Sequence, residues 1–183
     1  GILTTDTRAK LSSTQVSIGG QLVTITGLAK GAGMLKPKMA TMLSFVFTDA
    51  RIGQEKLDQF LEEAVNLSFN RLTVDGDTST NDCCMLTATG QSGVTISDHG
   101  DEALRVFKEA LLGIFQELAT NLIRDAEGAT KFVTVEVSGG KDEQECLRVA
   151  YCVAESPLVK TALFASDPNW GRILAVGLSL IHI

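Results

Sequence analysis

The first part of the sequence alternates between apolar and polar residues in the manner of β-strands. Residues 14–18 and 22–28 each alternate, and Gly19-Gly20 lies between them, so the two segments predict a β-hairpin. Residues 42–47 are apolar almost throughout and predict a strand that is buried on both faces. Residues 83–89 predict one more strand.

Two segments place apolar residues at the spacing of an amphipathic helix. One covers residues 55–69, with one face formed by Leu57, Phe60, Leu61, Ala64, Val65 and Ser68. The other covers residues 101–124, long enough to pack across a whole sheet, with a buried side formed by Leu104, Phe107, Leu111, Leu112, Phe115, Leu118, Leu122 and Ile123. A short third helix is predicted from Pro157 to about Ala165, because Ser156 is a favourable N-cap.

The segment between these helices predicts a loop and two strands. Residues 125–131 predict the loop, residues 132–137 alternate as a strand, and Gly139-Gly140 turns the chain toward a strand at residues 147–153. Strands and helices in mixed order predict an α+β fold in which helices cover a sheet. We expect residues 1–183 to form a single partial domain, because the chain starts without methionine or a signal peptide and reads as part of a longer protein.

Composition fits one domain with a sizeable core, since 44% of the residues are hydrophobic and 21% are charged. The net charge of -6 is unevenly distributed: no acidic residue occurs from Thr7 to Thr48, and that stretch carries Arg8, Lys10, Lys30, Lys36 and Lys38. Such a stretch can attract a small anionic ligand. Five cations without interleaved aromatic residues do not predict nucleic-acid binding. Apolar runs shorter than the ~18 residues of a membrane helix predict no membrane span.

The four cysteines, Cys83, Cys84, Cys146 and Cys152, form no C-x-x-C pair. We therefore interpret them as small, buried apolar residues of a protein in the reducing cytoplasm.

Common catalytic and metal sites find little support in the sequence. The two histidines, His99 and His182, lie in a polar turn and at the end of the chain, and no cluster has the spacing of zinc ligands. Gly31-x-Gly33 lacks the third glycine of a dinucleotide site. Residues 74–82 begin like a calcium loop but lack its glycine and its closing glutamate, so we interpret them as a side-chain-stabilised turn.

One nucleophile needs no histidine, namely a threonine at a chain N-terminus whose own α-amine is the base. Residues 30–43 form a turn-rich basic loop that runs into the apolar strand, with Thr41 at the junction after the small residue Ala40. A threonine in a strained loop can attack the preceding carbonyl, and hydrolysis of the resulting ester frees its amine. The loop is thus a candidate self-cleavage site between Ala40 and Thr41, although many threonines follow alanine before a strand.

Seven stretches, in order along the chain, resemble the ornithine acetyltransferase (bifunctional glutamate N-acetyltransferase) family of arginine biosynthesis. They are residues 4–7 (TTDT), 27–34 (GLAKGAGM), 37–43 (PKMATML), 47–50 (FTDA), 74–82 (VDGDTSTND), 127–131 (EGATK) and 167–172 (DPNWGR). The resemblance implies a layered α/β sandwich of the type shared with N-terminal-nucleophile aminopeptidases. It also implies an enzyme cut before Thr41 into two subunits that stay associated, as a heterotetramer of two such pairs.

The resemblance further implies that Thr41 accepts an acetyl group from N-acetylornithine and passes it to glutamate. Acetyl-CoA is a second acetyl donor in some members, and the reaction needs no metal or cofactor. Thr7, Lys30, Thr41 and Glu127 match substrate-contacting positions of the family. Without the resemblance, Thr7 reads as a turn hydroxyl, Lys30 as a solvated charge and Glu127 as a loop acid.

Two departures from the family pattern leave other functions open. The family's oxyanion-hole Thr-Gly pair and a C-terminal Asn and Thr are expected beyond the two ends of this chain, and the similarity stops at about Ala175. The alternatives are an N-terminal-nucleophile aminopeptidase or amidase, in which water replaces glutamate, and an inactive fragment or binding module.

Overall fold

A mixed four-stranded sheet forms the centre of the protein, whose structure is a computed structural model that describes residues 1–36, 42–78 and 81–179. The strands lie in the order β1 (Lys10–Ile18), β2 (Gln21–Lys30), β3 (Leu43–Thr48) and β4 (Cys83–Ala88). β1, β2 and β3 are antiparallel neighbours, whereas β3 and β4 run parallel. Gly19 and Gly20, with φ of 58° and 80°, form the tight turn that the hairpin prediction required.

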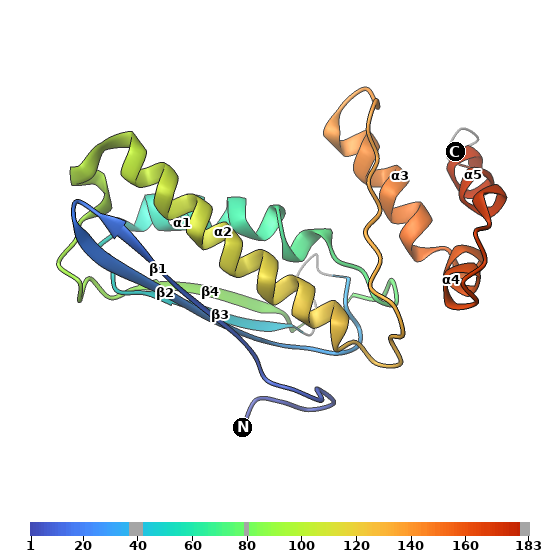
Figure 1. The fold of residues 1–183 in the computed structure, drawn as a ribbon, viewed down its shortest axis with the longest axis horizontal. Coiled ribbons are helices and arrows are strands. Elements are labelled where there is room, and N and C mark those ends of the chain that lie inside the picture. The colour runs from blue at the N-terminus through green and yellow to red at the C-terminus, as the bar shows by residue number, and fades with distance from the viewer. Residues whose placement is uncertain (37–41, 79–80, 180–183) are drawn as a thin grey trace.

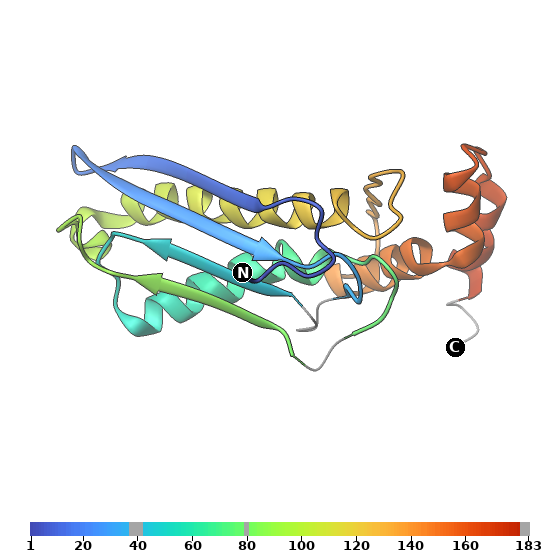
Figure 2. The ribbon, with the colours of Figure 1, turned by 90° about the horizontal axis from the view of Figure 1, so that it is seen from below.

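Two helices cover one face of this sheet, as Figures 1 and 2 show. They are α1 (Gln54–Asn66) and α2 (Gly100–Arg124), so both predicted amphipathic helices are confirmed. Short 3-10 turns, Phe69–Arg71 and Ile96–His99, follow α1 and precede α2. The core between the layers includes two aromatic pairs, Phe60 with Phe107 and Phe69 with Phe115, whose ring centroids lie 5.6 and 5.4 Å apart. Burial of each such side chain contributes ~1.5–3 kcal/mol to stability.

The long helix lies close to the sheet because β2 has a glycine where the two cross. A Cβ placed on Gly27 would lie 2.8 Å from Leu118 Cδ1 and 2.9 Å from Ile114 Cγ2. Real Cβ atoms do not approach carbon atoms this closely, so a side chain at position 27 would force Leu118 and Ile114 to shift in the core.

The opposite face of the sheet carries an apolar row that the described residues leave partly open. In register, the row is formed by Leu11, Leu28, Phe45 and Met85. Leu11 and Met85 are 61% and 50% exposed. Phe47 is 43% exposed, so the prediction that β3 is buried on both faces was wrong.

The C-terminal third forms a separate group of helices beyond the end of the sheet (Figure 1). They are α3 (Glu143–Glu155), α4 (Pro157–Phe164) and α5 (Trp170–Ser179). Ser156 Oγ accepts a hydrogen bond from the backbone N–H of Val159 at 3.4 Å, so the predicted cap of α4 is confirmed. Lys36 Nζ, 2.8 Å from Glu155 Oε1, and Lys160 Nζ, 2.5 Å from the carbonyl oxygen of Val74, connect the group to the rest of the chain.

Two predicted strands in this third were wrong. Residues 132–137 are irregular and pair with no strand of the described chain, and Phe132 and Val133 are 45% and 43% exposed. Residues 147–153 belong to helix α3, whose start is set by Asp142: its Oδ1 accepts from the N–H of Glu145 at 2.8 Å. An aspartate cap with glutamate three residues later is a helix-start signal, and it overrides the strand preference of the β-branched and aromatic residues that follow.

Across residues 1–36, 42–78 and 81–179, none of the helices combines the length and apolar character that a membrane crossing requires.

Candidate active site

Four parts of the described chain meet at one end of the sheet: the chain entering β1, the end of β2, the end of α2 and the aspartates Asp75 and Asp82. The predicted nucleophile Thr41 and its neighbour Ala40 lie outside the described residues. The other predicted site residues, Thr7, Lys30 and Glu127, belong to three of these segments. Their surroundings show how the fold brings together residues that are far apart in the sequence.

Lys30 ends β2, and its side chain is enclosed at this end of the sheet. The residue is only 7% exposed, and its Nζ donates a hydrogen bond to Thr4 Oγ1 at 3.1 Å. No carboxylate of the described residues lies within 4.0 Å of this Nζ. Since buried lysines are normally paired, Lys30 keeps donors available for an anion.

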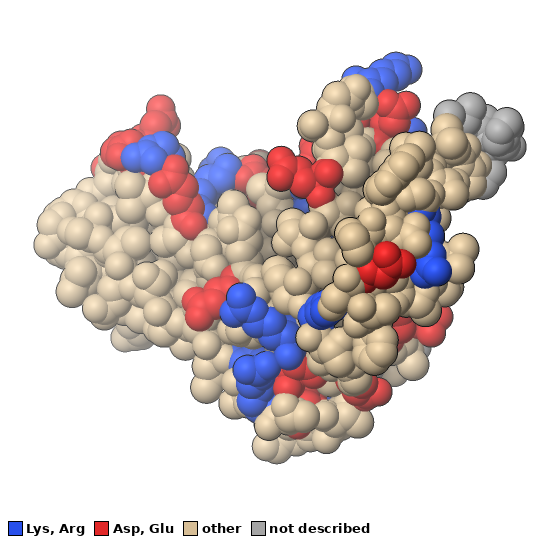
Figure 3. All heavy atoms as spheres, turned by 45° about the vertical axis from the view of Figure 1, so that its right-hand side comes forward, with Lys and Arg blue, Asp and Glu red and all other residues tan. Residues whose placement is uncertain are grey.

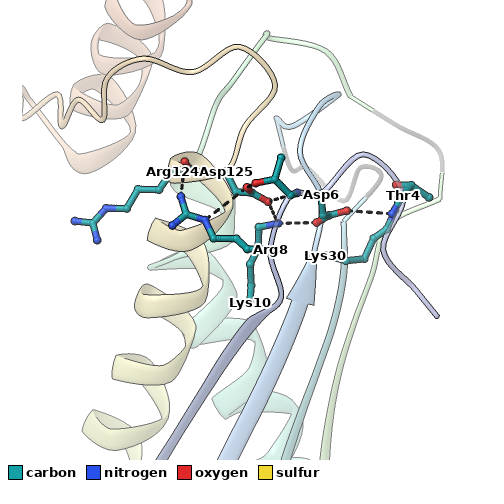
Figure 4. A network of polar contacts seen from close by, with 9 residues as sticks. Thr4, Asp6, Arg8, Lys10, Lys30, Arg124 and Asp125 are labelled. Atoms are coloured by element: carbon teal, nitrogen blue, oxygen red, sulfur yellow. Dashed lines mark hydrogen bonds and ion pairs between the residues drawn. The ribbon is translucent and has the colours of Figure 1, made fainter.

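Thr7 is held by Asp125. Asp125 follows helix α2 and is labelled in Figure 4. The backbone N–H of Thr7 donates to Asp125 Oδ2 at 3.1 Å, and its hydroxyl donates to Asp125 Oδ1. Thr7 itself is exposed, so its hydroxyl is also accessible from outside.

Asp125 also belongs to a buried ionic network. Lys10 Nζ lies 2.6 Å from both Asp125 Oδ2 and Asp6 Oδ1, and the Lys10 and Asp6 side chains are fully inaccessible to solvent. Asp6 Oδ1 accepts from the backbone N–H of Gly31 at 2.7 Å, which connects the network to the end of β2. Burial acts to raise the pKa of Asp125, but hydrogen bonds from Lys10 and Thr7 outweigh it and lower the pKa to about 2.

Glu127 lies two residues beyond Asp125 and is exposed. Its backbone N–H donates to the carbonyl oxygen of Ala32 at 2.7 Å. Its carboxylate lies over Gly33, where a Cβ would stand 3.1 Å from Glu127 Cδ. Glu127 thus lies beside the same loop that begins at Lys30.

Asp75 and Asp82 hold that loop on both sides of residues 37–41, which lie outside the described residues. Asp75 accepts from the backbone N–H groups of Met34 and Leu35, at 2.6 and 3.1 Å. Asp82 accepts from the backbone N–H of Met42. Asp75 also accepts from the N–H of Asp77 at 3.1 Å, as predicted for a side-chain-stabilised turn. The contacts to the loop have no local sequence signal, because they join residues about 40 positions apart.

Most of the positive charges expected around the loop, as far as the structure describes them, are paired with carboxylates. Lys10 is paired with Asp6 and Asp125, Arg8 Nε lies 3.5 Å from Asp125 Oδ1, and Lys36 is paired with Glu155. Figure 3 shows Lys and Arg side chains next to Asp and Glu side chains rather than in a patch of one sign. The acidic partners come from outside residues 7–48. The stretch therefore contains no acidic residue of its own, but the fold places acidic residues of other segments beside it.

Other nucleophile and metal candidates lie apart from this site. All four cysteines are free and only partly buried, and burial raises the pKa of Cys84 to about 12. His99 is exposed, as expected for a polar turn, and packs against Gly19. Within the described part of the chain, no group of three or more His, Cys, Asp or Glu residues is placed to hold a metal ion.

A mixed sheet covered by two helices, with a buried lysine and a carboxylate-held loop at one end, defines a layered α+β domain with a polar site at the sheet end. The chain belongs to the ArgJ family, whose sequence pattern it matches over residues 1–183. It is 56% identical over 176 residues to the arginine biosynthesis bifunctional protein ArgJ of Pseudomonas syringae pv. tomato, and 54% identical over 176 residues to that of Pseudomonas fluorescens. Each alignment covers 96% of this chain and 44% of the relative, so the chain spans less than half of these proteins.

A solved ArgJ structure has the same fold. The crystal structure of arginine biosynthesis bifunctional protein ArgJ from Bacillus halodurans superimposes with a TM-score of 0.70 and 44% sequence identity, over 75% of this chain and 64% of that one. The predicted α+β layered fold and family are thereby confirmed. The roles of Thr7, Lys30, Thr41 and Glu127 stay predictions.

Proposed function

We propose that the full-length protein containing this chain cuts itself between Ala40 and Thr41 and then transfers an acetyl group from N-acetylornithine to glutamate. Membership of the ArgJ family supports this assignment, because the relatives are named arginine biosynthesis bifunctional proteins. Residues 1–40 would end one subunit and residues 41–183 would form most of the other, with two such pairs in a heterotetramer. Acetyl-CoA is proposed as a second acetyl donor, without a metal or other cofactor.

The observation that carries the proposal is the buried Lys30 with no carboxylate partner among the described residues. N-acetylornithine and glutamate both have a carboxylate, which a lysine ammonium binds with a charge-assisted hydrogen bond. Lys30 is paired in register with Leu43, two residues after Thr41, and this pairing supports a shared site for the bound carboxylate and the proposed nucleophile. The exposed Glu127, beside Gly33 of the same loop, is assigned to the side-chain ammonium of ornithine.

The chemistry follows from a threonine at a new chain N-terminus. A free α-amine has a pKa of roughly 7.7–8.0. The α-amine of Thr41 therefore takes the hydroxyl proton as Oγ1 attacks the acetyl carbonyl. The C–N bond of N-acetylornithine breaks, and the departing α-nitrogen receives that proton. The amine of glutamate then attacks the acetyl ester and forms N-acetylglutamate, and the proton that this amine loses goes to Thr41 Oγ1.

Mass spectrometry of the full-length gene product tests the first step. We expect two chains separated between Ala40 and Thr41, and an uncut chain in the Thr41→Ala variant. An uncut wild-type protein after prolonged incubation would contradict the assignment of Thr41.

Mixing the cut protein with N-acetylornithine tests the second step and distinguishes the amidase alternative. We expect one acetyl group on the chain that starts at Thr41, removed much faster by glutamate than by water. Equal rates of removal would instead identify a hydrolase.

A further inference from the structure

Asp125 accepts hydrogen bonds from, or forms ion pairs with, three residues of one short segment, Thr7, Arg8 and Lys10. Thr7 contributes its backbone N–H and its hydroxyl, Arg8 lies 3.5 Å from Oδ1, and Lys10 lies 2.6 Å from Oδ2. Arg8 also donates to the carbonyl oxygen of Arg124 at 2.9 Å. Every group that faces this carboxylate is a donor, so Asp125 acts only as an acceptor.

This arrangement fixes the direction of the hydrogen bond from Thr7. A threonine hydroxyl has one proton and two lone pairs. Because the proton points to Asp125 Oδ1, the side of Thr7 Oγ1 that is accessible to a ligand offers lone pairs only. Thr7 can therefore accept a hydrogen bond from a ligand N–H but cannot donate one to a ligand oxygen.

The carboxylate has little freedom to turn away from Thr7. Asp125 is 6% exposed, and the fully buried Lys10 holds its Oδ2 on one side and Asp6 on the other. Asp6 in turn binds the backbone N–H of Gly31, next to Lys30. The geometry of Thr7 is thus set by the same network that positions the end of β2.

We infer that Asp125 is a positioning residue that fixes Thr7 as an obligate hydrogen-bond acceptor, so that the site selects ligands with an N–H group at this position. The inference rests on the proposed function for the identity of the ligand, an N-acyl amino acid. Lys30 and Thr7 then have opposite hydrogen-bonding roles: Lys30 donates to a ligand oxygen, whereas Thr7 accepts from a ligand N–H group.

Ligand selectivity in the full-length protein tests this inference. The probes are N-acetylornithine and its ketomethylene analogue, in which CH₂ replaces the amide N–H, with binding measured by calorimetry on a Thr41→Ala background so that no acetyl is transferred. We expect the Thr41→Ala parent to prefer the amide by about tenfold, the size of one hydrogen bond between neutral groups. We expect Thr7→Val and Asp125→Asn to lose most of that preference, while Thr7→Ser keeps it.

A matched control uses the same kind of contact between β1, the strand that follows Thr7, and α2, the helix that precedes Asp125. Ser12 Oγ on β1 donates to Glu117 Oε2 on α2 at 2.5 Å, so Glu117→Gln disturbs a similar hydroxyl–carboxylate pair away from the site. We expect Glu117→Gln to leave the amide preference intact. In the Thr7→Val background, Asp125→Asn should have no further effect on the preference, because it acts through the hydroxyl. A full amide preference in Asp125→Asn, or an added loss in the double variant, would overturn the inference.

Hydrogen–deuterium exchange separates failure of this inference from failure of the proposed function. If the Thr41→Ala protein binds neither probe and the wild-type full-length protein shows no acetyl transfer, the proposed function is contradicted, and exchange at the Thr7 amide then decides the positioning role. Faster exchange of that amide in Asp125→Asn than in Glu117→Gln supports the role of Asp125, and equal exchange overturns it.

Discussion

The carboxylate of Asp82 accepts a hydrogen bond from the backbone N–H of Met42, which directly follows the proposed nucleophile Thr41. Parallel pairing of β3 with β4 places Leu43 opposite Cys83, so the two preceding residues face each other. The position of Met42, and hence the start of β3, is therefore fixed from β4.

Loss of this contact is expected to slow self-cleavage. In Asp82→Asn the charged acceptor is gone, so the N–H of Met42 is held less firmly and the junction before it is less well oriented. We expect cleavage of the full-length precursor to slow by about tenfold or more. A gel time course measures the rate, with Asp77→Asn in the same turn as the control; equal rates for the two variants would contradict this role.

The same carboxyl group should give stability a pH dependence. Burial raises the pKa of Asp82 from 3.8 to about 6, against the opposing hydrogen bond from Met42. Because the pKa of Asp82 is raised in the folded state, the contribution of this carboxyl group to stability is fully present below about pH 4 and is lost as the pH rises through about 6. The test uses the uncleaved Thr41→Ala precursor as the parent. The difference in urea midpoint between Asp82→Asn and this parent should be more in favour of Asp82→Asn at pH 7 than at pH 4. An equal difference at the two pH values would refute the raised pKa of Asp82.

Asp125 predicts the opposite dependence. Its pKa is lowered from 3.8 to about 2, so its contribution is present above about pH 4 and is lost as the pH falls through about 2. For this nearly buried side chain the contribution is about 2 kcal/mol. Acid unfolding should show a smaller loss of stability between pH 4 and pH 2 in Asp125→Asn than in the parent, and an unchanged loss would be inconsistent with the pairing to Lys10.

Replacement of Lys30 is expected to weaken binding of both amino-acid substrates. Lys30→Met keeps the length of the apolar stem but removes the ammonium, so KM for N-acetylornithine and for glutamate should rise by about tenfold or more. Lys56→Met on α1, remote from this end of the sheet, is the control and should leave both values unchanged. A KM unaffected by Lys30→Met would remove the observation on which the proposed function rests.

A pair of glycine substitutions tests the contact between β2 and α2. Gly27→Ala places a Cβ 2.8 Å from Leu118 Cδ1 and should destabilise the protein by about 1–3 kcal/mol. Gly113→Ala, at an exposed position of α2 where an added Cβ would have nothing within 4 Å, should stabilise the protein by about 0.5–1 kcal/mol. Chemical denaturation of the full-length protein compares the two, and effects of the same sign would contradict the close approach.

Elements with a local signal could be predicted from the sequence. The hairpin around Gly19-Gly20, the amphipathic helices α1 and α2 and the capped helix after Ser156 all carry that signal within a few residues. Helix α3 was not predicted because Val149, Tyr151 and Val153 alternate with other residues as in a strand. The helix-start signal at Asp142 was not recognised. Residues 132–137 alternate like a strand, but alternation does not supply a partner strand.

The candidate site was predictable only in part, because its contacts join distant segments. Thr7, Lys30 and Glu127 were identified through family resemblance, and the fold brings them to one end of the sheet. The roles of Asp6, Asp125, Asp75 and Asp82 were missed. Asp125 lies 115 residues from Lys10, and no local pattern indicates that one will neutralise the other.

The proposed cut falls in the connection between β2 and β3, which are antiparallel neighbours in the middle of the sheet, paired from Ile25–Thr48 to Lys30–Leu43. Cleavage there would be a nick in a hairpin: the covalent link is lost while the hydrogen-bonded ladder and the core around Ile25 and Val46 remain. The ion pair between Lys10 and Asp125 would likewise become a contact between two polypeptides. Neither product could leave without opening the centre of the sheet, so the two chains would separate only on unfolding, and the pair would behave in dilution as one molecule.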